Sequence, residues 1–346
     1  EHVLISFIQN KKPDFAEIEA VLAPCAAANH WANRGPVYYE TAEVFADHLG
    51  IPEGSQIVPC ANGGVALEIP ARLLEHQKGQ KLRWVASAFS FHNIGRGYFS
   101  DVGFVDIDDQ GMLDLAEVER LDPAEFDGII VVNPFGMADD FARYTDLAKR
   151  LDKHLLIDNA AGVGPGIPDW PWQSFSLHHT KPYGFGEGGL ALVPTEFVEP
   201  FYSLIDYGDQ PEPASLWFNN GKVSDLSCAM HLAWLNRVDH WAPMYVAQSQ
   251  RVDTIARDMG LWPLHPVHPR RLTMSRAYRC GRDVDISVVR STQNVKCGKY
   301  YKPLCELPST LALYAELVNI PSHPDMAQLS DEQLRDDIRR LLGTAR

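Results

Sequence analysis

The sequence predicts an α/β protein with a mostly parallel central sheet, helices on both faces of that sheet, and a smaller C-terminal α+β domain. From about residue 55 to 193, short apolar runs alternate with helical patterns, which is typical of a doubly covered parallel sheet. The chain has 346 residues, of which 45% are apolar and 22% charged, enough for a sizeable core. After Pro243 the pattern changes to mixed strands and helices. We therefore expect a large domain over residues 1–240 and a small one over 241–346.

The expected elements follow one another in a regular order. Strands are predicted in the apolar runs "QIVPC", "LRWVASAF", "VGFVDID", "GIIVVNPF", "HLLIDNA", "SFSLHH" and "GGLALV". Helices are predicted from Gly63 through "VALEIPARLLEHQ", in "DLAEVERL" and in "FARYTDLAKRL". Residues 208–222 are rich in glycine and proline and predict a loop, followed by a helix from Asp225 to about Val238. The closing stretch "SDEQLRDDIRRLLGTAR" predicts an amphipathic helix whose Ser330 and Gln333 have capping-box spacing.

Charge and cysteine usage narrow the class of protein. A net charge of −14 disfavours nucleic acid and anionic membranes as partners, because both would be repelled over most of the surface. The sequence has no run of 18 apolar residues, and its start, "EHVLISFIQNKKPDF", lacks the layout of a signal peptide. The six cysteines are scattered without a C-x-x-C pair, which indicates reduced thiols. We expect a cytoplasmic enzyme with no nucleic-acid or membrane partner.

A glycine-rich stretch, "SFSLHHTKPYGFGEGGLALV" (residues 174–193), admits two interpretations. Gly184, Gly186 and Gly189 match G-x-G-x-x-G, the pattern of a dinucleotide-binding loop in an oxidoreductase. Such a loop needs a helix after the glycines, because the helix N-terminus holds the pyrophosphate. Here a second apolar run follows and ends at Pro194. We therefore expect the glycines to allow a tight turn, and we prefer this interpretation to a nicotinamide-binding site.

Lys181, in the same stretch, is one of three features that together indicate a different cofactor. Asp158 ends an apolar strand, where a buried carboxylate is costly without a cationic partner. Asn62, Gly63 and Gly64 lie where a strand meets a helix start and could present backbone N–H groups to a phosphate. Taken singly, these could be a solvated lysine, a turn-capping carboxylate and a plain turn. Taken together, they are what pyridoxal 5'-phosphate requires.

The order of several motifs carries a family resemblance through most of the chain. They are "HWANRGPVYYETAEVFADHLG", "CANGGVAL", "FVDIDDQGMLDLAEVE", "VVNPFG", "LIDNAAGVG", the serine-to-lysine segment with its "GEGG", and "NNGKVSDLSCAM". In this order the chain resembles the DegT/DnrJ/StrS family of pyridoxal-phosphate-dependent nucleotide-sugar aminotransferases. That resemblance implies the aspartate aminotransferase fold (fold type I) and pyridoxal 5'-phosphate as cofactor.

The resemblance also implies roles for single residues. Lys181 would be the Schiff-base lysine and the proton carrier, and Asp158 the partner of the pyridinium nitrogen. Gly63 and Gly64 would offer backbone N–H groups to the phosphate, and Ser176 a hydroxyl.

Three further positions complete the implied site. Ala160 would lie against one face of the ring and an aromatic of "SAFSFHN" against the other, with Phe89 preferred to Phe91 or His92. Asn220 matches an asparagine that reaches the phosphate from a neighbouring subunit. The resemblance therefore implies a homodimer with shared active sites.

Departures from the family pattern concern contacts to the cofactor and substrate. Ala161 replaces a glutamine or histidine, Gly64 a threonine, and Ile157 a glutamate, and "YYKPLCELPST" is shorter than the family's stretch, which often carries a histidine. Each lost polar contact would weaken cofactor binding by about 1–3 kcal/mol unless water replaces it. Family members that dehydrate sugars have histidine in place of the lysine, so Lys181 argues against dehydration. His178 and His179, nearby, are expected to be structural or surface residues.

The expected reaction is therefore transfer of an amino group from an amino acid, glutamate, to a nucleotide-linked keto-deoxysugar. "WANRGP" and the pair Asn220 and Lys222 resemble members that act on 4-keto-6-deoxyhexoses. Three alternatives remain open: amination of a ketocyclitol, a non-catalytic family member that acts as a binding or regulatory protein, and an oxidoreductase that binds a nicotinamide cofactor with the glycine loop.

Overall fold

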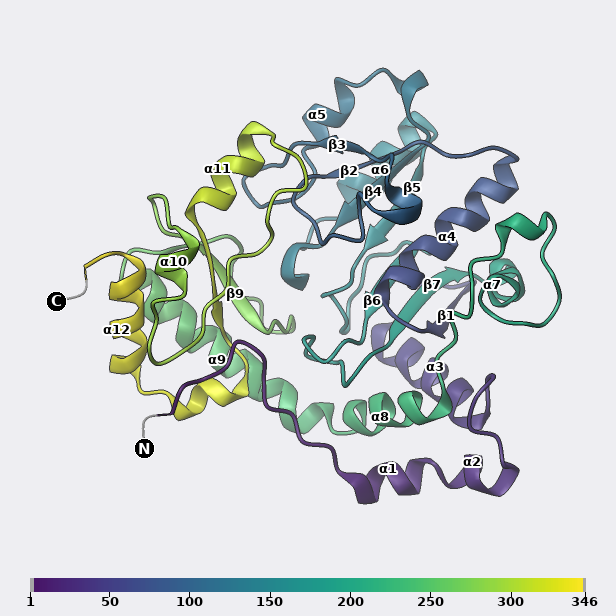
Figure 1. Cartoon of the computed structure of the whole chain (residues 1–346), viewed down its shortest axis with the longest axis horizontal. Coiled ribbons are helices and arrows are strands. Elements are labelled where there is room, and N and C mark those ends of the chain that lie inside the picture. Colours follow the sequence, from purple (N-terminus) through teal and green to yellow (C-terminus); the bar gives the residue numbers. More distant parts are fainter. Residues whose placement is uncertain (1–2, 345–346) are drawn as a thin grey trace.

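The computed structural model describes residues 3–344 and contains a seven-stranded sheet in the order β1-β7-β6-β5-β4-β2-β3 (Figure 1). Its strands are β1 (Ser55–Cys60), β2 (Trp84–Ser87), β3 (Gly103–Val105), β4 (Gly128–Val132), β5 (His154–Asp158), β6 (Gln173–Ser176) and β7 (Gly189–Pro194). β7 runs antiparallel to β1 and β6, and the other neighbours pair in parallel. The predicted mostly parallel sheet is confirmed.

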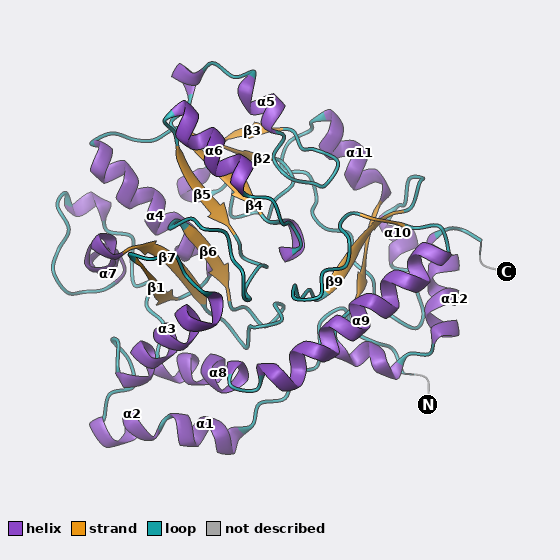
Figure 2. Ribbon diagram, turned by 180° about the vertical axis from the view of Figure 1, so that it is seen from behind, coloured by secondary structure: helices purple, strands orange, loops and turns teal. Residues whose placement is uncertain are grey.

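Helices cover both faces of this sheet, as Figures 1 and 2 show from opposite sides. On one face, α4 (Gly63–Lys78) and α7 (Val198–Ile205) pack on Val58, Ala191 and Ile130 and their neighbours. On the other face lie α3 (Pro36–Leu49), α5 (Leu115–Glu119) and α6 (Ala142–Leu151), against side chains that include Ile57, Ile129 and Leu155. Neighbouring residues such as Ile57 and Val58 point to opposite faces, so each strand needs apolar residues at nearly every position.

The start of α4 shows how the sequence sets an element boundary. The side chain of Asn62 caps the helix by accepting a hydrogen bond from the Val65 N–H (2.9 Å). Gly79 ends it in the left-handed conformation, with φ 73°. The helix predicted from Gly63 is therefore confirmed.

The C-terminal part is built on a three-stranded antiparallel sheet in the order β10-β9-β8 (Figure 2). Helix α8 (Asp225–Leu235) packs against α3 and joins the core of the large sheet. The elements that follow it are α9 (Val238–Asp258), β8 (Trp262–Pro263), β9 (Ser275–Arg279), α10 (Ile286–Val289), α11 (Pro308–Glu316), β10 (Leu317–Pro321) and α12 (Asp331–Leu341). The helix predicted to reach Val238 ends at Leu235, and α9 begins after a two-residue turn. The capping box predicted for Ser330 and Gln333 is present at the start of α12.

The N-terminal segment connects the two parts of the chain. Ile5 forms a parallel bridge with Val295 and is buried in the C-terminal core. The chain then crosses to the large sheet and forms α1 (Phe15–Val21) and α2 (Ala23–Ala28), and α1 packs along α8 (Figure 1). The expected boundary between residues 240 and 241 falls inside α9 and stays a prediction. Among the helices of residues 3–344, none is long and apolar enough to cross a membrane.

Candidate active site

Lys181 and Asp158 lie at the carboxyl ends of neighbouring strands. Asp158 is the last residue of β5, and Lys181 lies in the loop between β6 and β7. Ligands of open α/β sheets bind outside the carboxyl ends of the strands, where loops diverge. The two side chains are close enough for each charge to shift the pKa of the other.

Asp158 is buried without a cation in direct contact. Asp158 is only 5% exposed. Its Oδ1 accepts one hydrogen bond, from the Ala160 N–H at 3.2 Å. Burial raises the pKa of Asp158 to about 6, although the Ala160 N–H and the charge of Lys181 both lower it. No described residue forms an ion pair with this carboxylate. It therefore retains unused acceptor capacity, suited to an N–H group of a bound ligand.

Lys181 is poised for use as an amine. Burial lowers the pKa of Lys181, and the charge of Asp158 opposes this shift. Within residues 3–344, its Nζ donates no hydrogen bond and forms no ion pair, Asp158 included. A desolvated lysine loses its proton more readily, which is the condition for nucleophilic attack on an aldehyde.

The loop that carries Lys181 is a compact turn between two antiparallel strands. The Lys181 N–H donates to the His178 carbonyl (2.8 Å), and the Gly184 N–H donates to the Lys181 carbonyl (3.0 Å). A Cβ on Gly184 would lie 1.9 Å from the His178 carbonyl oxygen, and one on Gly189 would lie 2.2 Å from that of Asn62. The glycines therefore serve close backbone approach. Because strand β7 follows them, and no helix, the loop does not have the geometry of a dinucleotide site.

The start of α4 forms a cradle for an anion. The N–H groups of Gly63 and Gly64 donate to no described residue, as expected for the first turn of a helix. A Cβ on Gly63 would lie 3.1 Å from the Ser176 Cβ, so Ser176, which carries a hydroxyl group, lies directly beside this helix start. The Ser176 N–H in turn donates to the Ala160 carbonyl (3.1 Å). These residues fit a phosphate group at one end of a ligand and Asp158 at the other.

An aromatic group adjoins Asp158, and part of it was missed in the sequence analysis. Phe89 is fully buried and packs edge-on against Tyr301, with 5.4 Å between ring centroids. Tyr301 stacks on Phe135 at 5.2 Å. Burial raises the pKa of Tyr301, and the charge of Asp158 adds to this shift. The one signal for Tyr301 in the sequence was its place in "YYKPLCELPST", where the family often has a histidine.

Other predicted positions lie apart from this cluster. Phe91 is 59% exposed, and His178 is also exposed and contacts Thr180 through its Nδ1 at 2.9 Å. Asn220 lies on an exposed loop, and its side-chain oxygen accepts from the Lys222 N–H at 3.3 Å. That loop is tied to the cradle's edge by the Ala61 N–H, which donates to the Gly221 carbonyl (2.8 Å). The cross-subunit role of Asn220 stays a prediction.

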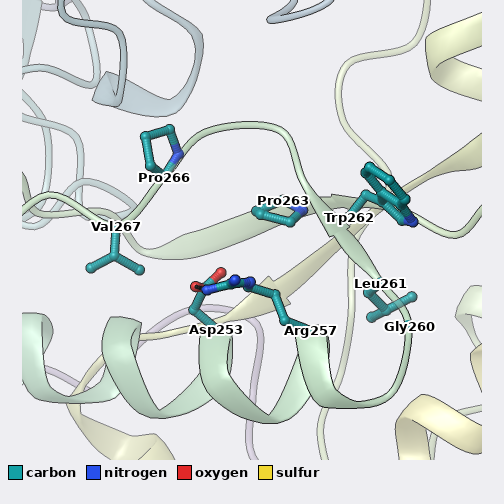
Figure 3. A pocket seen from close by; sticks show the side chains of 8 residues that line it. All are labelled: Asp253, Arg257, Gly260, Leu261, Trp262, Pro263, Pro266 and Val267. Carbon is teal, nitrogen blue, oxygen red and sulfur yellow. Dashed lines mark ion pairs between the residues drawn. The ribbon is translucent and has the colours of Figure 1, made fainter.

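A separate cavity of about 880 Å³ opens between α9 and β8 (Figure 3). Its charged lining residues, Asp253 and Arg257, form an ion pair at 3.8 Å. Asp253 also accepts hydrogen bonds from Arg276 and Tyr278, both at 3.0 Å. Since these groups satisfy one another, we place the candidate site at Lys181 and Asp158.

Comparison with known proteins gives matches over most of the chain. Residues 13–339 match the DegT/DnrJ/EryC1/StrS aminotransferase family. Protein Rv3402c of Mycobacterium tuberculosis is 25% identical over 378 residues, which span 98% of this chain and 89% of that protein. Protein Mb3436c of Mycobacterium bovis is 25% identical over 379 residues, with the same coverage of both chains.

Three solved structures share the fold. DesI, crystallised in the presence of its TDP-sugar product, has a TM-score of 0.80 at 19% identity and covers 99% of this chain and 94% of its own. Helicobacter pylori PseC, an aminotransferase involved in the biosynthesis of pseudoaminic acid, has a TM-score of 0.80 at 17% identity and covers 99% of each chain. A DegT DnrJ EryC1 StrS aminotransferase from Brucella abortus has a TM-score of 0.77 at 20% identity and covers 95% of this chain and 96% of its own. The predicted fold type is confirmed.

Proposed function

Because the chain belongs to the DegT/DnrJ/EryC1/StrS aminotransferase family, we propose that it transfers an amino group from glutamate to a nucleotide-linked keto-deoxysugar, a 4-keto-6-deoxyhexose. The family confirms the predicted enzyme class, a sugar aminotransferase, and the predicted cofactor, pyridoxal 5'-phosphate. The donor and the sugar are the parts that we propose.

The observation that carries the proposal is that Lys181 and Asp158 lie close together, without an ion pair between them, beside an anion cradle. When bound, the cofactor supplies an aldehyde carbon and a ring that withdraws electrons from it. Lys181 would attack that carbon with its Nζ and later move a proton beside it. Asp158 would accept the N–H of the ring nitrogen, which its free acceptor capacity and its burial favour.

The remaining predicted residues would hold and orient the cofactor. Gly63 and Gly64 would donate their free N–H groups to the phosphate, with Ser176 beside them. Ala160 and Phe89 would lie against the two faces of the ring. Gly64 and Ala161 provide no side-chain hydrogen-bonding group where the family has one, and backbone N–H groups or water would have to replace those contacts.

The nucleotide-sugar substrate rests on similarity and on the sequence motifs. DesI was crystallised with its TDP-sugar product, and that protein matches this chain over nearly its full length. Lys222, two residues after Asn220, lines a cavity of about 450 Å³ together with Arg34. Arg34 pairs with Asp206 at 2.6 Å, so Lys222 supplies the uncompensated positive charge among the described lining residues. A nucleotide diphosphate needs such charge, so we propose this region as a contributor to substrate binding.

The first experiment is a visible absorption spectrum of the purified protein with pyridoxal 5'-phosphate, before and after glutamate. The proposal predicts a band from the lysine–cofactor bond that disappears as the amino group is taken up. Addition of a nucleotide-linked 4-keto-6-deoxyhexose should then restore the band and yield an aminated sugar, detected by mass spectrometry. A band that ignores glutamate would contradict the proposed donor, and failure of the sugar step alone would contradict the proposed acceptor.

The ketocyclitol and the non-catalytic alternatives give different results in the same assay. A ketocyclitol aminotransferase would restore the band with free ketocyclitols and not with nucleotide sugars. A non-catalytic binding protein would not hold the cofactor, or would hold it without responding to any amino donor. The shifted pKa values of Lys181 and Asp158 favour the catalytic interpretation, because burial of two ionisable groups without an ion pair is costly and brings a protein without a reaction no benefit.

Assembly and location belong to the same proposal. We propose a homodimer in which Asn220 of each subunit serves the site of the other, as the family pattern implies. We also propose the cytoplasm as its compartment, which the six free cysteines of the structure fit. Light scattering coupled to size-exclusion chromatography tests the dimer.

A further inference from the structure

Lys11 is a buried lysine that contacts the loop carrying Lys181. It is 7% exposed and lies just before α1, far from that loop in sequence. Its Nζ donates to the carbonyl oxygens of Gly184 (2.5 Å), Lys181 (2.6 Å) and His179 (3.1 Å), and lies 3.4 Å from that of Pro182. One ammonium group thus binds the backbone on both sides of Lys181.

The environment of Lys11 holds no carboxylate to balance its charge. It forms no ion pair with any residue from 3 to 344, and its Nζ lies 5.3 Å from the centroid of the Trp234 ring. Burial lowers the pKa of Lys11 to about 7. A buried charge of this kind is costly, so an apolar residue at this position would be favoured unless the contacts serve the site.

The carbonyl groups need a cation to converge as they do. Several carbonyl oxygens pointing at one spot repel one another, and an ammonium with three N–H donors removes that repulsion. One of these carbonyls belongs to Lys181 itself, whose N–H is fixed by His178 at 2.8 Å. Lys11 and His178 therefore fix the two peptide groups that flank the Lys181 side chain.

The segment around Lys11 is itself anchored to the C-terminal part. The Gln9 side chain accepts a hydrogen bond from the Tyr245 hydroxyl on α9, and the Asn10 N–H donates to Asp325 at 2.7 Å. The position of the Lys11 ammonium is thus set by contacts on both sides of the site.

We propose that Lys11 is a positioning residue, which holds the 179–184 backbone so that the amine of Lys181 is directed toward the cofactor's aldehyde carbon. This inference rests on the proposed function. The step it assists forms a C=N double bond between Lys181 Nζ and that carbon, while the aldehyde oxygen leaves as water with the two amine hydrogens. Lys11 touches none of the reacting atoms and acts through the backbone.

The test compares Lys11→Met with Lys12→Met. Methionine keeps the length of the side chain and removes the cation, and Lys12 is the exposed neighbour, so its variant is a matched control. Two quantities are measured on the full chain: the rate of formation of the lysine–cofactor band with pyridoxal 5'-phosphate, and the dissociation constant of pyridoxamine 5'-phosphate, which has no aldehyde. Circular dichroism confirms that each variant is folded.

We expect Lys11→Met to slow formation of the band by about 10–100-fold, since a displacement of about 1 Å has effects of that size. Its affinity for pyridoxamine 5'-phosphate should stay within about threefold of the parent, because the cradle and Asp158 are untouched. Lys12→Met should match the parent in both measurements. A merely structural role would weaken both quantities together.

Three results would overturn the inference. Equal rates for Lys11→Met and Lys12→Met would refute it while leaving the proposed function intact, and so would a parallel loss in both measurements. A parent protein that forms no band through Lys181, as mapped by borohydride reduction and mass spectrometry, would refute the proposed function and this inference with it. If Lys11→Met does not fold, Lys11→Gln, a polar substitution of similar size, takes its place under the same criteria.

Discussion

Replacement of Asp158 by asparagine should stabilise the cofactor-free protein and abolish its chemistry. The asparagine amide keeps an oxygen to accept the Ala160 N–H, which now donates to Asp158 at 3.2 Å, and removes the buried negative charge. A residue retained only for folding would not be expected to destabilise the fold. The opposite signs of the two effects would identify Asp158 as a residue kept for function.

The magnitude follows from the pKa of Asp158. Burial raises this pKa from 3.8 to about 6, so the folded state binds its proton more tightly than the unfolded state. The stability that Asp158 contributes is therefore fully present below pH 3.8 and is lost as the pH rises to about 6. A pKa difference of about 2 corresponds to roughly 3 kcal/mol. The new amide N–H group, if it lacks a partner, offsets this by a pH-independent amount of about 1–3 kcal/mol.

The assay is urea unfolding of cofactor-free parent and Asp158→Asn protein at intervals from pH 4 to pH 7, followed by tryptophan fluorescence. Lys181, whose pKa burial lowers, is present in both proteins, so each comparison is a difference between the variant and the parent at one pH. We expect the free energy of unfolding of the variant, relative to the parent, to rise by about 2.4 kcal/mol from pH 4 to pH 7. Turnover with cofactor should fall by about 100-fold or more.

Two results would refute this reasoning. A stability difference that does not change between pH 4 and pH 7 would mean that Asp158 has an ordinary pKa and is not desolvated. A variant with the parent's turnover would mean that the carboxylate does not serve the cofactor ring.

The remaining predictions concern the lysine, the cradle, Tyr301 and the subunit interface. Lys181→Ala should retain the fold and lose turnover entirely, and a variant that aminates at the parent rate would contradict the assignment. Gly63→Ala should weaken cofactor binding by about tenfold, because the added Cβ would lie inside the cradle, 3.1 Å from the Ser176 Cβ. If a fluorescence titration with the cofactor gives an unchanged dissociation constant, the phosphate binds elsewhere. Tyr301→Phe should form the lysine–cofactor band normally and lower kcat/KM for the keto substrate by about fivefold, because the phenol hydroxyl has no described partner and is free to bind substrate. Equal kcat/KM values for variant and parent would show that the Tyr301 hydroxyl does not contact the substrate. Mixed and refolded Lys181→Ala and Asn220→Ala proteins should regain up to about a quarter of the parent activity if Asn220 serves the neighbouring site, whereas no recovery would place Asn220 in its own subunit's site or in none.

Much of the candidate site could be predicted because its elements depend on local sequence. The cap at Asn62, the glycines after it and the end of β5 at Asp158 are each written in a few consecutive residues. The glycine pattern around Lys181 was also interpretable locally, since the run after Gly189 has the composition of a strand. The end of α8 was placed three residues too late, because the turn between Leu235 and Val238 contains no glycine or proline to mark it.

The sequence by itself determined the alternation of strands and helices, the helix start at Gly63 and the choice of Lys181 and Asp158 as candidate site residues, because apolar periodicity and turn chemistry act over short stretches. The tertiary structure alone decided that β7 lies antiparallel between β1 and β6, that Tyr301 packs on Phe89 and Phe135, and that Lys11 binds the Lys181 loop. These contacts join segments far apart in the chain, and which distant segments meet is set by the packing of the whole core, which no local pattern encodes.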